Sequence, residues 1–161
     1  MKLTTKGRYA VMAMADLARF GTGKPVALAD IAQRQEISLS YLEQLFAKLR
    51  RGDLVKSVRG PGGGYRLARS AEDIRISDVI LAVDEPIKAT RCETGSPKGC
   101  MNGSSSRCIT HDLWEELSHQ IQVFLNGVSL SDVINGRVVK SSEAVEDIEI
   151  SEKPLTASAA E

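Results

Sequence analysis

The sequence predicts a mainly α-helical fold with one small β-hairpin, and three observations support this fold class. Residues 28–51 contain two short helical patterns joined by a tight turn, and residues 54–69 contain two strand patterns around a glycine-rich tip. Residues 110–126 form a long helical pattern with an apolar seam. At 161 residues the chain can form one compact domain with an extra arm or tail. It contains no apolar run of about 18 residues, which argues against a membrane span.

The N-terminal segment predicts a buried helix rather than a targeting signal. A charged start and an apolar stretch superficially suggest a signal peptide, but Asp16 and Arg19 interrupt the apolar part and no cleavage-like motif follows. We therefore expect a mature N-terminus and a cytoplasmic protein. Residues 5–19 form the helical stretch, which glycine and proline end at residues 21–25. The apolar positions expected to be buried are Tyr9, Val11, Met12, Met14 and Leu17.

The next segment predicts a helix-turn-helix. Residues 28–35 form a short helix, "ISLS" is a tight connection, and residues 41–51 form a second helix. The apolar residues of the second helix stand at i, i+3, i+4 and i+7 and predict one buried stripe, made of Leu42, Leu45, Phe46 and Leu49. The opposite face is polar and basic, as in a DNA-recognition helix, although helix pairs of this shape also occur in proteins that never touch DNA.

The hairpin that follows makes the pattern that of a winged helix. "LVKSV" (54–58) and "YRLAR" (65–69) predict two strands, and "RGPGGG" (59–64) predicts a tip with little side chain. Such a wing can lie along the phosphate backbone or in a minor groove, with Arg59 and the glycine amides facing the strand. A plain flexible hairpin is the alternative.

The charge distribution indicates a polyanion partner for the first half of the chain. Residues 1–70 hold 13 Lys and Arg against 5 Asp and Glu, whereas residues 71–161 hold 8 against 16. A basic half joined to an acidic half is typical of a protein that binds nucleic acid through one part. The residues expected to contact DNA are Ser38, Ser40, Tyr41, Glu43, Gln44, Lys48, Arg51, Arg59, Gly60 and Pro61.

Glu43 is the unusual member of this set, because a carboxylate repels phosphates. It could accept a hydrogen bond from a cytosine amino group and penalise DNA sites that lack one. Alternatively, Ser40-x-x-Glu43 matches a capping box, in which Glu43 satisfies the start of the helix. The two roles are compatible, and the sequence leaves both open.

The second half predicts two further helices and a tail. Residues 74–85 suggest a short helix capped by Ser77 and stopped at Pro86. A longer helix runs from about Thr110 to Asn126. Its seam has spacings of 3, 4, 3 and 4, as in a two-stranded coiled coil, and consists of Trp114, Leu117, Ile121, Phe124 and Val128. The seam could pack on its own domain, but a symmetric dimer is favoured because palindromic DNA sites require one.

All three cysteines and one of the two histidines lie within residues 92–111. Cys92, Cys100, Cys108 and His111 have the spacing C-x7-C-x7-C-x2-H, and three thiolates with one imidazole can complete a four-ligand site. A reducing compartment argues against disulfides. Thr110 resembles a helix N-cap, which would hold His111 close to Cys108. His119 is a less favoured alternative ligand, and an exposed or seam position suits it better.

Zinc and an iron–sulfur cluster are both candidates for this site. Zinc accepts three Cys and one His, but its sites usually include a tight C-x(2–4)-C pair, which is absent here. The long intervals suit a larger group such as an iron–sulfur cluster, in which an imidazole ligand would make the cluster easier to perturb. Unligated surface thiols are the remaining alternative.

Five motifs resemble a known family of winged-helix transcription regulators. "MKLTTKGRYAV", "ISLSYLEQLFAKLR", "VRGPGGGYRL", "AVDEPIKATRC" and "CITHDLWEELS" are similar to segments of a family that includes iron–sulfur cluster regulators, nitric-oxide sensors and cysteine-metabolism sensors. The resemblance covers residues 1–135. It implies a homodimer that binds promoter DNA and controls iron–sulfur assembly genes, with the assembly machinery as cluster donor.

The resemblance also implies a [2Fe-2S] cluster held by Cys92, Cys100, Cys108 and His111, whose occupancy changes which DNA sites are bound. The cysteine intervals are longer here than is familiar in that family. A nitric-oxide sensor and a winged-helix module with structural zinc are the alternatives. An enzyme is not expected, because the sequence lacks a catalytic triad pattern and "GPGGG" lacks the lysine of a phosphate-binding loop.

The predicted organisation has four parts. They are a winged helix-turn-helix domain at 1–85, a cluster-binding loop at 86–111, a dimerisation helix with its following segment at 112–136, and a disordered acidic tail at 137–161.

Overall fold

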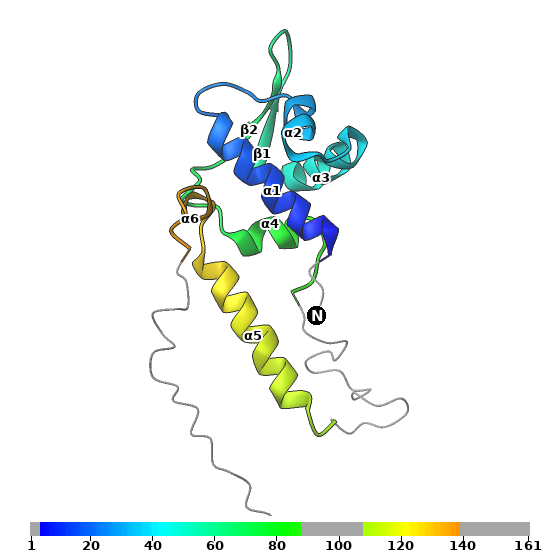
Figure 1. Cartoon of the computed structure of the whole chain (residues 1–161), viewed down its shortest axis with the longest axis vertical. Coiled ribbons are helices and arrows are strands. Elements are labelled where there is room, and N and C mark those ends of the chain that lie inside the picture. The colour runs from blue at the N-terminus through cyan, green and yellow to red at the C-terminus, as the bar shows by residue number, and fades with distance from the viewer. Residues whose placement is uncertain (1–3, 88–107, 139–161) are drawn as a thin grey trace, which may run out of the picture.

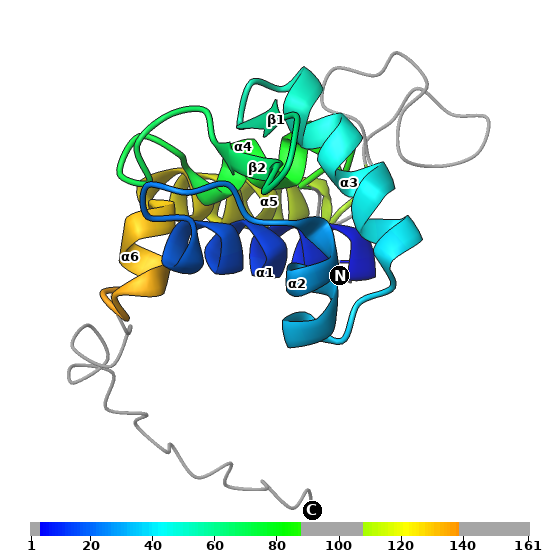
Figure 2. The same cartoon turned by 90° about the horizontal axis from the view of Figure 1, so that it is seen from above.

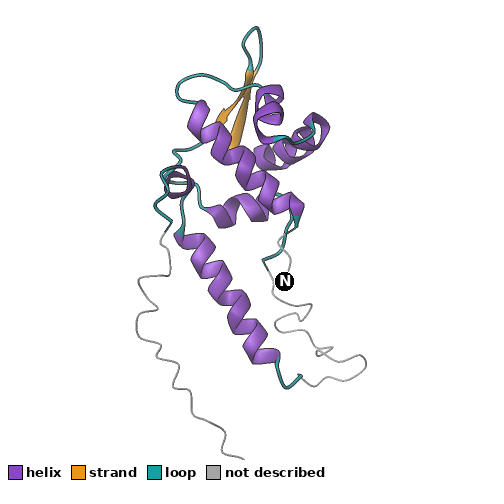
Figure 3. Ribbon diagram, viewed as in Figure 1, coloured by secondary structure: helices purple, strands orange, loops and turns teal. Residues whose placement is uncertain are grey.

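The computed structural model describes residues 4–87 and 108–138, drawn in colour in Figure 1 and by secondary structure in Figure 3. Within these residues helices predominate and one small hairpin is present, which confirms the predicted fold class. The cysteines at 92 and 100 and the acidic segment from 139 lie outside the described residues. None of the helices in the described part is both long and apolar enough to cross a membrane.

Helix α1 (Thr5–Phe20) runs through the centre of the body. Met14 and Leu17 are buried as expected, whereas Tyr9, Val11 and Met12 are only half-buried, which corrects the prediction for these three residues. Thr4 caps it, because its side chain accepts a hydrogen bond from Lys6 N at 3.3 Å. The residues that α1 buries most deeply are small or flexible, namely Ala10, Ala13, Met14 and Leu17. Figure 2 shows α3 and α6 beside opposite ends of this helix.

Helices α2 (Leu28–Gln35) and α3 (Leu39–Arg51) form the predicted helix-turn-helix. Glu36 ends α2 in the left-handed conformation, with φ of 53°, and the chain turns at once into α3. The predicted apolar stripe of α3 is confirmed, since Leu42, Leu45, Phe46 and Leu49 are at most 2% exposed. Helix α3 starts two residues earlier than expected because Ser38 caps it, accepting from Tyr41 N at 3.4 Å.

A buried ion pair joins α1 to α2. The side chain of Asp16 is fully buried, and its Oδ1 lies 2.7 Å from Arg34 Nη2. Gln35 Nε2 donates to Asp16 Oδ2 at 2.8 Å. A buried carboxylate is tolerated when its oxygens are hydrogen-bonded, and this one fixes α2 against the central helix.

Strands β1 (Val55–Val58) and β2 (Gly64–Leu67) form the antiparallel wing, with Val55 opposite Leu67 and Val58 opposite Gly64. Val26 extends the sheet by an antiparallel bridge to Tyr65, with Tyr65 N donating to Val26 O at 2.8 Å and Val26 N to Tyr65 O at 2.9 Å. The wing is therefore attached to the segment between α1 and α2, a contact that the sequence pattern did not indicate.

Helix α4 (Ile76–Ala82) is shorter than predicted, and Ser77 does not cap it. The Asp78 carboxylate accepts from Arg75 N at 3.3 Å at the start of the helix, whereas Ser77 is buried and donates to Asn126 Oδ1 at 3.2 Å. The helix ends before Asp84, whose φ of 55° is left-handed. The prediction that Ser77 is the cap is wrong because Ser77 connects α4 to the long helix instead.

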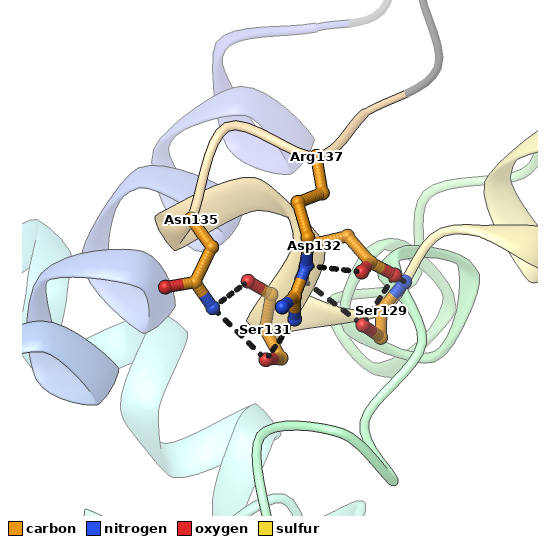
Figure 4. Close-up of polar contacts among 5 residues, drawn as sticks. All are labelled: Ser129, Ser131, Asp132, Asn135 and Arg137. Carbon is orange, nitrogen blue, oxygen red and sulfur yellow. Dashed lines mark hydrogen bonds and ion pairs between the residues drawn. The ribbon is translucent and has the colours of Figure 1, made fainter.

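Helix α5 (His111–Gly127) is followed by α6 (Leu130–Ile134), which the sequence analysis did not predict. Ser129 caps α6 in a capping box with Asp132 (Figure 4). The Asp132 carboxylate also lies 3.5 Å from Arg137 Nε. Leu130 is fully buried in the core formed by the winged helix. The chain therefore returns from α5 to the body, and α6 packs on α1.

Candidate functional site

The start of α3 presents most of the residues expected to contact bases. Ser38, Ser40, Glu43 and Gln44 are exposed there. Tyr41 is half-buried, and its ring meets the ring of Tyr9 edge-on, with centroids 6.0 Å apart. This edge-on contact with α1 fixes the orientation of the first turn of α3. An exposed, rigid helix start of this kind is what a recognition helix inserts into a major groove.

The structure removes one of the two roles considered for Glu43. The capping box Ser40-x-x-Glu43 is wrong, because Ser38 occupies the cap and Ser40 lies inside the helix. Glu43 is exposed in the second turn of α3, beyond the backbone amides that a cap satisfies.

Lys48, expected to contact phosphate, takes part in an ion pair. Its Nζ lies 2.7 Å from Asp84 Oδ2. The hydrogen bond with Asp84 raises the pKa of Lys48, and the same bond lowers the pKa of Asp84. Asp84 also accepts through its carbonyl from Lys6 Nζ at 3.1 Å. A phosphate would compete with Asp84 for Lys48, whereas Arg51 is exposed on the same helix.

The tip of the wing is exposed at Arg59, Gly60 and Pro61. The tip needs glycine at Gly60, whose φ of 108° is strained for any other residue, and Gly63 N donates to Gly60 O at 2.9 Å. At the base of the wing, a Cβ on Gly64 would collide with the backbone carbonyl of Val26. The glycines thus close the turn and let the wing approach its neighbouring segment.

The carboxylate of Glu85 satisfies the first turn of α1 from across the molecule. It is almost fully buried and accepts from Thr4 N at 2.5 Å, Thr4 Oγ1 at 2.8 Å and Gly7 N at 2.6 Å. Burial alone would raise its pKa, but these hydrogen bonds outweigh burial, so the pKa of Glu85 lies below the ordinary value of 4.5. Gly7 has no side chain to block this approach, since a Cβ there would lie 2.7 Å from Glu85 Oε2.

The sequence analysis did not identify Asp84 and Glu85 as residues that contact α1 and α3, although Gly7 in α1 indicated such a contact. Gly7 is an unfavourable residue in the first turn of a helix, which indicates a close approach by another group. The adjacent acids in "VDEP" are the candidates for that group. Glu85 binds the start of α1 and Asp84 binds Lys48 of α3, so the two acids connect these helices to the chain just after α4. Glu85 lies seven residues before Cys92.

Two of the four predicted metal ligands lie together at the start of α5. His111 N donates to Cys108 O at 3.0 Å, which closes a turn over Ile109 and Thr110. Cys108 Sγ lies 3.7 Å from Thr110 Oγ1. Thr110 holds the N-cap position as predicted, but its side chain makes no capping hydrogen bond.

The imidazole of His111 is 5% exposed, and its Nε2 lies 3.3 Å from Glu115 Oε2, one helical turn further on. His119 is exposed and lines a hollow of about 380 Å³ between α4 and α5. It lies two turns along α5 from His111 on the face toward α4. A soft thiolate and a buried imidazole are ligand types that iron–sulfur and zinc sites accept, so the residues described here fit either group.

The predicted seam of α5 is open to solvent over most of its length. Trp114 is 37% exposed, Leu117 39% and Phe124 49%. Figure 1 shows that α5 leaves the body, with its first turn far from α6 and its last turn close to the body. Apolar side chains exposed along one helix indicate a surface that associates with another protein surface.

A helix-turn-helix followed by a wing, with a polar helix start and an exposed basic tip, defines a winged-helix DNA-binding regulator. Comparison with known families agrees, because the Rrf2 family, described as iron-dependent transcriptional regulators, matches residues 3–136. The chain belongs to the Rrf2 family.

Comparison with individual relatives shows which regulators of the family the chain is similar to. The HTH-type transcriptional regulator IscR of Pectobacterium carotovorum subsp. carotovorum is 52% identical over 150 residues, which cover 93% of this chain and 89% of the relative. The solved structure of T. potens IscR has a TM-score of 0.68 and 37% identity, covering 85% of this chain and 88% of that one. CymR (YrzC), the global cysteine regulator of B. subtilis, has a TM-score of 0.70 and 31% identity, covering 84% and 98%. The chain is a transcription regulator similar to IscR, and the expectation that it is no enzyme is confirmed.

Proposed function

We propose that this regulator senses an iron–sulfur cluster and binds promoter DNA as a homodimer in the cytoplasm. A [2Fe-2S] cluster held by Cys92, Cys100, Cys108 and His111 changes which DNA sites it binds and thereby controls iron–sulfur assembly genes. The assembly machinery donates the cluster. The observation that carries the proposal is the hydrogen-bonded turn that holds Cys108 and His111 together at the start of α5.

The donor set supports a cluster at this position. Thiolates with one imidazole suit an iron–sulfur cluster, and the turn brings one donor of each type to one helix end. When bound, the cluster supplies a redox-active and oxygen-labile group. The chain's own residues hold it, and the connection of Asp84 and Glu85 to α1 and α3 offers a route by which the loop could influence the recognition helix.

Charge and exposure support DNA binding through α3 and the wing. The exposed start of α3 supplies Ser40, Glu43 and Gln44 for base edges, while Arg51 and Arg59 supply phosphate contacts. Glu43 would then select DNA sites by repulsion or by accepting from cytosine. The exposed apolar seam of α5 supports a homodimer, since palindromic sites are matched by two-fold symmetry.

Metal content separates the cluster from its alternatives. The full chain is purified without oxygen, its visible spectrum is recorded, and iron, sulfide and zinc are measured. We expect iron and sulfide in equal amounts, two of each per chain in a [2Fe-2S] protein. Stoichiometric zinc without iron or sulfide would overturn the cluster proposal in favour of a structural zinc site. Rapid loss of DNA binding with nitric oxide, but not with iron shortage, would favour a nitric-oxide sensor.

Two pairs of variants test the assigned residues. His111→Ala should weaken cluster retention far more than His119→Ala, because only His111 lies beside Cys108. For DNA, Arg59→Ala should weaken binding to all sequences, whereas Gln44→Ala should change the preferred sequence. Unchanged binding of a palindromic promoter fragment by both DNA variants would refute the proposed interface.

A further inference from the structure

A basic hollow of about 320 Å³ lies at the base of the wing, between the connection that follows α1 and strand β2 with the residues after it. Three exposed cationic side chains line this hollow, and they are Lys24, Arg66 and Arg69. No acidic residue in the described part of the chain lines it. Of the three cations only Arg69 makes an ion pair among the described residues, with its Nη2 3.9 Å from Asp78 Oδ2. The hollow therefore presents two positive charges that no carboxylate neutralises.

The walls of the basic hollow are held together by backbone hydrogen bonds. Val26 N donates to Tyr65 O at 2.9 Å, and Tyr65 N donates to Val26 O at 2.8 Å. This bridge holds Lys24, two residues earlier, beside β2. Gly23 turns the chain just before Lys24 with φ of 81°, and the space around it is open. The cations thus belong to a fixed surface that an extended ligand can approach.

The strand pairing contains an arrangement of charge that costs stability. Lys56 of β1 lies directly opposite Arg66 of β2, and both residues are exposed. Residues directly opposite in an antiparallel pair share one face of the sheet, and like charges there are destabilising. Solubility would be served as well by an acid at either position, which would add a favourable pair across the strands. The repeated positive charge therefore indicates a surface for an anionic partner.

The position of the basic hollow relative to α3 suits a DNA duplex. Figures 1 and 2 show the wing between α3 on one side and the connection after α1 on the other. In the proposed complex α3 enters a major groove, and the wing tip at Arg59 reaches the adjacent minor groove. The phosphate backbone on the far side of that minor groove then lies on the side of the hollow, and its charge complements Lys24 and Arg66.

We propose that the basic hollow binds the phosphate backbone of duplex DNA on the side of the wing away from α3. Lys24 and Arg66 make the phosphate contacts, and Arg69 contributes less because Asp78 shares it. The inference rests on the proposed function, because it extends the DNA interface of α3 and the wing to the connection between α1 and α2. Phosphate contacts carry no sequence information, so the hollow fixes how the body lies on the duplex and leaves base preference to α3.

Charge-removing and charge-keeping variants separate a phosphate contact from a structural role. Lys24→Gln and Arg66→Gln each remove one proposed contact, whereas Lys24→Arg and Arg66→Lys keep the positive charge. Arg137→Gln is the matched control for net charge. Arg137 is exposed after α6, does not line the hollow, and has its Nε 3.5 Å from Asp132 Oδ1.

The experiment measures binding of the full chain, purified without oxygen, to a palindromic promoter fragment and to a duplex of unrelated sequence over a range of salt concentrations. We expect Lys24→Gln and Arg66→Gln each to lower the slope of log Kd against log salt by about 0.9 for every DNA-bound chain. Between about 1 M and about 0.1 M salt, this change amounts to about eightfold weaker binding. The slope should fall equally for both duplexes, and the charge-keeping variants and Arg137→Gln should keep the wild-type slope.

Several results would overturn the proposal. Wild-type slopes in both Lys24→Gln and Arg66→Gln would do so, as would an equal fall in Arg137→Gln, which would indicate an effect of net charge alone. A loss confined to the promoter fragment would also contradict a phosphate contact. Urea denaturation gives an independent check, because Arg66→Gln removes the repulsion with Lys56 and should keep or raise the urea midpoint. A lower midpoint would mean that Arg66 serves the fold, against the proposal.

Failure of this inference and failure of the proposed function give different results. A wild type that binds the promoter fragment, together with glutamine variants of wild-type slope, would overturn only the role of the basic hollow. A wild type that binds neither duplex would overturn the proposed DNA binding and this inference with it.

Discussion

Replacement of Glu85 by glutamine should destabilise the fold, because its carboxylate has three hydrogen-bond donors. Oε1 of Glu85 accepts from Thr4 N, and Oε2 accepts from both Thr4 Oγ1 and Gly7 N. A glutamine amide replaces one oxygen with an NH2 group, which cannot accept. In one orientation the NH2 group meets Gly7 N–H and in the other it meets Thr4 N–H. Either way, one backbone donor loses its acceptor, the buried Gly7 N–H or the partly buried Thr4 N–H.

The cost follows from these contacts. A hydrogen bond to a charged group contributes about 1.5–3 kcal/mol, and an unsatisfied buried donor costs about 1–3 kcal/mol. Since glutamine keeps part of the network in neutral form, we expect Glu85→Gln to lower the free energy of unfolding by about 2–4 kcal/mol at pH 7. Urea denaturation of the full chain at fixed protein concentration measures this loss in the free energy of unfolding. Glu72→Gln, which removes an exposed carboxylate, is the control.

The pH dependence gives a second check with a defined sign. The pKa of Glu85 is lowered in the folded protein, so its contribution to stability is present above the ordinary value of 4.5. It is lost as the pH falls through the lower, folded pKa. The stability difference between the wild type and Glu85→Gln should therefore shrink below pH 4.5. Equal stability at pH 7, or a difference that stays constant into acid, would refute the reasoning.

Three further predictions concern the wing, the recognition helix and α6. Gly64→Ala should lower the free energy of unfolding by about 1–3 kcal/mol, because the added Cβ would collide with the backbone of Val26. Gly127→Ala is the control, since open space surrounds its Cβ, and it should leave the free energy of unfolding unchanged. Urea denaturation measures both variants. Asp84→Asn should release the ammonium of Lys48 and steepen the salt dependence of DNA binding by about one unit of log Kd against log salt; an unchanged slope would mean that Lys48 makes no phosphate contact. Leu130→Ala should cost about 2–5 kcal/mol, because Leu130 is fully buried; a cost below about 1 kcal/mol would mean that α6 is peripheral.

The elements that the sequence predicted well are those whose pattern is local. The stripe of α3 and the wing follow from spacings and turn residues that lie within a few positions of one another. The cap of α3 was misplaced because "SLS" offers two serines, and only the backbone shows that Ser38 is the cap. Helix α6 was missed because it is a single short turn whose burial comes from α1 rather than from its own periodicity.

The candidate site was predictable in its residue types and less so in its contacts. The positions of Cys108 and His111 at the start of α5 follow from "CITH" preceding a helical pattern. The contacts of Lys48 with Asp84 and of Thr4 with Glu85 join residues 36 and 81 positions apart, and no local pattern encodes such distances.

Among the residues that the structure describes, helix α5 is attached to the body at its last turn. The bridge between Arg75 and Ser129, the bond from Ser77 to Asn126 and the burial of Leu130 hold its last turn to the body. Its 17 residues extend about 25 Å from that attachment. Such a helix rotates as a rigid rod about the point where its last turn joins the DNA-binding body. A shift of about 2 Å at the Cys108 end then rotates the helix axis relative to the body by roughly 5° over that length. In the proposed homodimer, a small change in the packing of the turn before α5 would change the angle at which the two DNA-binding bodies meet one duplex.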